Sequence, residues 1–149
     1  MPFFKHEREW KITLDGIHTT HKQLHLDLQI PMSPGDILAS LLVMEELYNL
    51  YEKIEEDTTH YELTIEDASL LVGMYTSFHR RLHMALSTPH AVIVEFTDEV
   101  AKEDQITILG ELMDVSLTLR WRCLRHLVSL GVDVSAELAK DMTYTTAEA

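Results

Sequence analysis

The sequence is poor in residues that several common protein classes require. Cys123 is its single cysteine, so an internal disulfide is impossible, which fits a reducing compartment. Its five glycines are scattered and form no glycine-rich phosphate loop. No apolar run approaches the roughly 20 residues that a membrane-spanning helix needs, and the N-terminus lacks the apolar stretch of a secretory signal. We therefore expect a cytoplasmic protein that does not enter the membrane.

Basic residues are also scarce. Twelve lysines and arginines stand against 25 aspartates and glutamates, and the net charge is −13. This balance argues against nonspecific nucleic-acid binding, which uses lysine and arginine to neutralise phosphates. Three of the twelve bases cluster in residues 115–132, which contain no acid. This segment supplies four candidate interaction residues: Arg120, Trp121, Arg122 and Arg125. A contact between this basic segment and an acidic one would produce a homo-oligomer.

The first part of the chain has the periodicity of β-structure. With 149 residues and 46% hydrophobic content, the chain can bury one core, and we expect a single domain over 1–149. Residues 10–14 and 24–30 alternate apolar with polar side chains, and Asp15-Gly16 is typical of a tight hairpin turn. The sequence therefore predicts a β-hairpin region over about 9–30.

After Ser33 the apolar residues recur at steps of three or four, which is typical of helices. Ser33 and Pro34 favour a helix start, Thr64 can cap a second helix, and Gly131 suits a helix end. The predicted helices cover about 34–57, 64–87, 103–130 and 135–142, with a helix or a strand over 90–101 and a frayed tail over 143–149. The predicted core stripe of the first helix is Ile37, Leu41, Met44, Tyr48 and Tyr51. The predicted fold is mainly α, with a β-hairpin followed by a bundle of three to five helices over about 34–142.

Nine histidines raise the question of a metal site. His79 and His83 are four residues apart, which places both rings on one helical face. Together with the stretches 10–24 and 121–126, His79 gives the chain a resemblance to a hemerythrin, which implies a diiron site in a helical bundle. His83, however, stands where that family has a glutamate ligand. We therefore interpret the histidines as ordinary boundary or surface residues and predict no resident metal or cofactor.

Pairs of carboxylates suggest an alternative. Glu111-Leu112-Met113-Asp114-Val115 resembles the second carboxylate motif of MazG-like nucleotide pyrophosphohydrolases. The resemblance implies an all-α enzyme in which two such helices hold Mg²⁺, and the metal orients a water against a nucleoside triphosphate. The first motif departs from the family, because Asn49 replaces the second glutamate after Glu46. In this alternative, Mg²⁺ would be held by Glu46, Glu52, Glu55, Glu111 and Asp114.

The layout of residues 9–120 suggests a third family. An alternating stretch ends at Asp15-Gly16, prolines mark the entry into helices over 30–36, and an acidic segment over 100–105 precedes the last long helix. In this layout the chain resembles the tail assembly chaperones of long-tailed phages. The resemblance implies a non-catalytic role in the host cytoplasm, in which the protein covers apolar surface of a tape-measure or tail-tube protein. We take this role, a non-catalytic binding and assembly protein, as the predicted function.

A further alternative is an acidic inhibitor that imitates nucleic acid or blocks a basic groove. It predicts that the acids of 45–67 and 95–114 form one continuous exposed face. The chaperone prediction instead requires exposed apolar surface larger than is usual for a monomer. The hydrolase alternative requires the carboxylates of Glu111 and Asp114 to face those of the earlier segment across a cleft.

Overall fold

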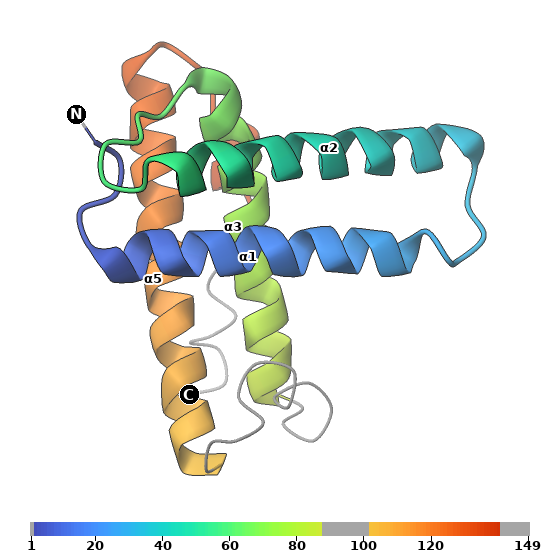
Figure 1. Ribbon diagram of the computed structural model, residues 1–149, viewed down its shortest axis with the longest axis horizontal. Helices are drawn as coiled ribbons and strands as arrows, with labels where there is room; N and C mark the ends of the chain where they lie inside the picture. Colours follow the sequence, from blue (N-terminus) through green and yellow to red (C-terminus); the bar gives the residue numbers. More distant parts are fainter. Residues whose placement is uncertain (1, 88–101, 141–149) are drawn as a thin grey trace.

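The computed structural model describes residues 2–87 and 102–140, with side chains over 2–84 and 107–140. Its helices are α1 (Glu7–Asp27), α2 (Pro34–Glu56), α3 (Ile65–Ser87), α5 (Lys102–Ser129) and α6 (Ser135–Leu138). Two antiparallel pairs, α1 with α2 and α3 with α5, cross one another (Figure 1). The mainly helical prediction is confirmed, and the described residues contain no strand. None of the helices in these ranges has the length and apolar character needed to cross a membrane.

The predicted β-hairpin over 9–30 is wrong, because this segment forms α1. The buried residues of α1 include pairs at helical steps of three and four and are Glu9, Ile12, Thr13, Leu14, Gly16, Ile17 and Thr19. Four of these seven are polar or glycine, so the helical period of the buried residues is weak in the hydropathy pattern, and the alternation of Trp10, Ile12 and Leu14 gives the stronger signal. The buried Thr13 is accommodated because its hydroxyl donates to the Glu9 carbonyl at 2.9 Å and bonds the Tyr75 hydroxyl at 2.6 Å.

Asp15-Gly16 marks a helix crossing instead of a turn. A Cβ atom placed on Gly16 would lie 2.8 Å from Met74 Sδ and 3.3 Å from Phe78 Cδ2, both on α3. The missing side chain therefore allows α1 to approach α3 closely. A glycine inside a helix costs about 1 kcal/mol relative to alanine, and the packing of Ile17 and Phe78 at this crossing offsets that cost.

The predicted helix boundaries after Ser33 are confirmed for the three long helices. The Ser33 hydroxyl accepts from the Asp36 N–H at 3.2 Å and caps α2, and the Thr64 hydroxyl accepts from the Asp67 N–H at 3.1 Å before α3. Gly131 follows α5 with φ of +82°, the left-handed conformation that favours glycine. The short α6 begins at Ser135 and ends four residues before the predicted end. The predictions for 90–101 and 143–149 lie outside the described residues.

The core lies where the two pairs cross, and the N-terminal segment completes it. Phe3 and Phe4 are buried against Tyr61, with the rings of Phe4 and Tyr61 stacked at 5.8 Å, and the Phe3 N–H donates to the Tyr61 carbonyl at 2.8 Å. Cys123 is fully buried in α5, and this burial raises the pKa of its thiol far above the ordinary value. The thiol is therefore a small core group and not a reactive thiolate.

Candidate functional site

The outer ends of α1 and α2, with the connection between them, extend beyond the α3–α5 pair (Figure 1). We name residues 20–43 the arm. No residue of the arm is buried, whereas Thr19 and Met44, which flank it, are both buried. The arm carries only three ionised side chains, Lys22, Asp27 and Asp36, although the whole chain has a net charge of −13. The acidic character of the protein therefore belongs to the rest of the molecule.

The arm exposes a stripe of aliphatic side chains along α2. Ile37 and Leu41 form one row and Leu38 and Leu42 the next, because residues four apart lie above one another on a helix. Their exposed fractions are 37%, 48%, 58% and 50%. Residues 37–44 contain no charged side chain and one polar side chain, Ser40, so this part of α2 is almost entirely apolar, although α2 packs mainly on α1. Helices of that kind are normally covered on every side.

The predicted core stripe of α2 is therefore only partly correct. Ile37, Leu41 and Tyr48 are exposed, and the buried residues of α2 are Met44, Leu47, Leu50 and Ile54. Apolar residues occupy almost every position of 37–44, so periodicity alone could not identify the side that packs. All the buried residues of α2 lie at or after Met44, and the part of the helix before Met44 lies outside the core.

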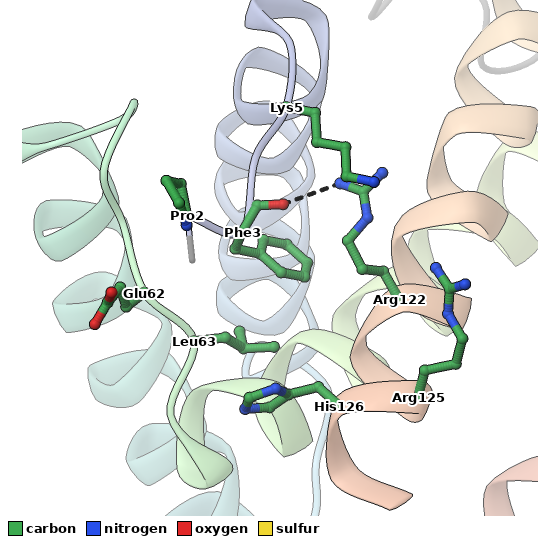
Figure 2. Close-up of a pocket in the computed structure, with 8 residues that line it drawn as sticks. All are labelled: Pro2, Phe3, Lys5, Glu62, Leu63, Arg122, Arg125 and His126. Carbon is green, nitrogen blue, oxygen red and sulfur yellow. Dashed lines mark hydrogen bonds between the residues drawn. The ribbon is translucent and has the colours of Figure 1, made fainter. Parts of the chain in front are cut away.

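A second site lies at the other end of α1. A cavity of about 350 Å³ is lined by Pro2, Phe3, Lys5, Glu62, Leu63, Arg122, Arg125 and His126. Figure 2 shows these residues on three segments that are distant in sequence: the N-terminus, the loop before α3 and the second half of α5. We name this cavity the basic pocket, because three of its lining residues are cationic.

Arg122 is fixed in the wall of the basic pocket. Its two terminal nitrogens donate to the two carboxylate oxygens of Glu9 at 2.7 and 3.0 Å, and one also donates to the Phe3 carbonyl at 3.0 Å. Burial alone would raise the pKa of Glu9, but the hydrogen bonds from Arg122 and from the Lys5 N–H outweigh it and lower the pKa. This bidentate pair ties α5 to α1 and to the N-terminal segment.

The four candidate interaction residues do not share one surface. Arg120 is 2% exposed, and its guanidinium donates to the Glu137 carbonyl at 2.8 Å. Arg122 belongs to the ion pair with Glu9. Trp121 and Arg125 are exposed. The basic character of 115–132 therefore comes from two structural arginines, Arg120 and Arg122, and one exposed arginine, Arg125.

The carboxylates of the hydrolase alternative are on two helices, α2 and α5, that each pack mainly on a different helix and not on one another. Glu46, Glu52 and Glu55 are exposed on α2, which packs mainly on α1, and Glu111 and Asp114 are exposed on α5, which packs mainly on α3. Within residues 2–87 and 102–140, no group of three or more His, Cys, Asp or Glu is arranged to hold a metal ion. The structure thus does not bring the two motifs together. The acidic-inhibitor prediction depends partly on 95–101, which lie outside the described residues.

Two of the three histidines of α1, His18 and His21, line a cavity. Because this segment is helical, His18 and His21 are on neighbouring turns, and they border a space of about 310 Å³ with Ile17, Tyr48 and Tyr51. This cavity lies between α1 and α2 at the base of the arm. Its tyrosine rings and Ile17 give it a largely apolar wall.

His79 differs from its predicted place at a boundary or surface. It is fully buried on α3, and burial, together with nearby His83 and Arg120, lowers its pKa to about 4. The ring is therefore neutral at pH 7. The prediction of a surface histidine fails because α5 covers this face of α3.

The arm and the basic pocket differ in how many of their residues the sequence could identify. The uncharged run 37–44 is visible in the sequence as an almost entirely apolar stretch of helix, but its periodicity predicts core and not an exposed surface. Arg122 and Arg125 were singled out, but Phe3 and Lys5 join them only through the fold. Comparisons with family models, with curated proteins and with solved structures give no match for this chain.

Proposed function

We propose that this protein is a non-catalytic binding and assembly protein whose arm covers an apolar helical surface of a partner protein. The observation that carries the proposal is the stripe of Ile37, Leu38, Leu41 and Leu42, which is uncovered in the described structure. Contiguous exposed apolar surface on a folded chain commonly marks a site of protein interaction.

The shape and charge of the arm favour a helical, apolar partner. Two antiparallel helices with open sides form half of a four-helix bundle, which a partner helix or helix pair would complete. Burying the exposed halves of four aliphatic side chains contributes about 4 kcal/mol before the cost of association. With only three ionised side chains, the arm offers little for an ion-pairing partner.

A phage tail assembly chaperone is the specific form of this function that we propose. Part of the original resemblance is lost, because residues 10–16 belong to α1 and form no hairpin. Support comes from the proline-marked entry into α2 and from the aliphatic stripe, which suits a protein that covers apolar surface before assembly. The partner would then be a tape-measure or tail-tube protein in the host cytoplasm.

The general proposal is tested with reduced insulin, whose released B chain aggregates through apolar surface and scatters light. The wild-type protein should suppress the scattering at near-equimolar concentration, and Leu38→Gln/Leu42→Gln should lose most of this effect. Val128→Gln/Leu138→Gln is the matched control, because these side chains are 56% and 53% exposed but lie outside the arm. The control variant should behave like the wild type.

Equal suppression by the wild type and the arm variant would refute the role of the arm. Sedimentation velocity on the same samples distinguishes two cases: an arm that binds the client, and an arm that is covered by a second copy of this protein in a dimer. Dimerisation without any effect on the client would overturn the assembly function. The tail-specific role predicts co-purification with an identified tape-measure or tail-tube protein, lost in the arm variant and kept in the control.

A further inference from the structure

We infer that the basic pocket binds a small organic anion, in which an oxyanion group is carried on an apolar body. The pocket lies at the end of α1 opposite to the arm, between the N-terminal segment and α5 (Figures 1 and 2). The inference is independent of the proposed function of the arm.

The charge at the pocket has the opposite sign to that of the chain. Lys5, Arg122 and Arg125 line it, and the carboxylates beside them are Glu9 and Glu62, so the local balance is positive in a chain of net charge −13. Within the described residues, the side chains of Lys5 and Arg125 form no hydrogen bond or ion pair. Two cations without a counterion beside a third create a favourable place for a negative group.

The cationic wall is already organised before a ligand arrives. Glu9 and the Phe3 carbonyl hold the Arg122 guanidinium in one place, and that guanidinium also lies 5.7 Å from the centre of the Phe3 ring. In Figure 2, Lys5 and Arg125 flank Arg122. A donor group that is fixed in advance loses little entropy when it binds, which favours a specific site over a diffuse surface charge.

The rest of the lining explains why the anion should carry an apolar body. Pro2, Phe3 and Leu63 line the pocket together with the cations. His126 also lines the pocket, and its buried Nε2 has no hydrogen-bond partner within the described residues. A volume of about 350 Å³ is at the small end of ligand pockets and suits one ring with an acidic group.

The experiment uses phenylacetate and phenyl phosphate as probes, with benzyl alcohol as their neutral analogue. Binding to the full-length protein is followed by two-dimensional amide NMR at low salt. We expect at least one of the two anions to shift the amides of residues 2–5 and 122–126, with at least tenfold higher affinity than benzyl alcohol. The two anionic probes distinguish a carboxylate ligand from a phosphate ligand.

Substitution of Arg125 provides the decisive comparison, because its side chain makes no contact that the fold needs. Arg125→Gln should weaken binding of the anion about tenfold, the usual worth of one charge-assisted hydrogen bond. Arg80→Gln, which removes an exposed arginine on α3, is the matched control and should bind like the wild type. Equal affinity for the anions and benzyl alcohol, or undiminished binding by Arg125→Gln, would overturn the inference.

Discussion

The buried His79 predicts a loss of stability in mild acid. In the folded protein its pKa is lowered to about 4, mainly by burial, from an ordinary value of 6.5 in the unfolded chain. Between these two values the unfolded chain binds a proton that the folded chain does not, so acid favours unfolding. This contribution to stability is complete above pH 6.5 and is lost progressively as the pH falls toward 4.

The size of the effect follows from the two pKa values. One pKa unit corresponds to about 1.4 kcal/mol, so the full loss is about 3 kcal/mol below pH 4. The measurement is better made at pH 5.5, above the isoelectric point of about 4.9. Between pH 8 and pH 5.5 the same linkage predicts a loss of about 1.4 kcal/mol. That is a substantial part of the roughly 5–15 kcal/mol by which domains are stable.

Urea unfolding of three proteins at both pH values isolates this contribution from the titration of the carboxylates. His79→Leu should lose about 1.4 kcal/mol less than the wild type between pH 8 and pH 5.5, because it has no ring to protonate. His25→Gln, which removes an exposed histidine of α1, should lose as much as the wild type. If the wild type and His79→Leu show the same pH dependence, or if NMR gives His79 a pKa near 6.5, the reasoning is refuted.

Three further substitutions test the packing. Gly16→Leu should lower the free energy of unfolding by about 2–3 kcal/mol, because even a Cβ there would lie 2.8 Å from Met74 Sδ. Glu9→Gln should lower it by about 2–3 kcal/mol, since it leaves the Arg122 guanidinium, only 16% exposed, without its carboxylate. Ser33→Ala should lower the hydrogen-exchange protection of the first turn of α2 by about 1 kcal/mol, with little change in the unfolding midpoint because the arm is outside the core.

Each of these predictions has its own control. Gly73→Leu is the partner of Gly16→Leu, because a Cβ on Gly73 meets nothing within 4 Å, and equal effects of both would contradict the close crossing of α1 and α3. For Glu9, strict additivity with Arg122→Met in a double-mutant cycle would show that the pair does not interact. If Ser33→Ala lowered the free energy of global unfolding as much as it lowers the hydrogen-exchange protection of the first turn of α2, the arm would belong to the cooperative core.

The helix ends were predictable because their determinants are local. Ser33, Thr64 and Gly131 act within three residues of the backbone groups that they satisfy or the bend that they allow. A short stretch of sequence therefore contains the whole physical cause. The same reason explains why the ends of α2, α3 and α5 were placed within one or two residues.

The helical state of the first segment was not predictable from its periodicity. The side chains that decide it, Thr13 and Gly16, owe their burial to Tyr75 and Met74, which are about sixty residues away in the chain. Taken alone, Thr13 indicates a strand and Asp15-Gly16 a turn. Tertiary contacts override both preferences.

The candidate sites also combine features that are visible in the sequence with features that depend on tertiary contacts. The aliphatic side chains of the arm were visible as a run of residues, but only the fold reveals that nothing described covers them. The basic pocket joins Lys5 to Arg122 and Arg125, more than a hundred residues away, through the docking of the N-terminal segment on α5. No spacing rule in the sequence could bring these groups together.

The separation of charge from the arm has a consequence for ionic strength. Two acidic bodies repel each other over roughly the Debye length, which is about 8 Å in physiological salt. Added salt shortens this range but leaves contacts between Leu38, Leu42 and an uncharged partner surface intact. Association of the arm with another acidic protein should therefore tighten as salt is added, whereas a complex held by ion pairs would dissociate.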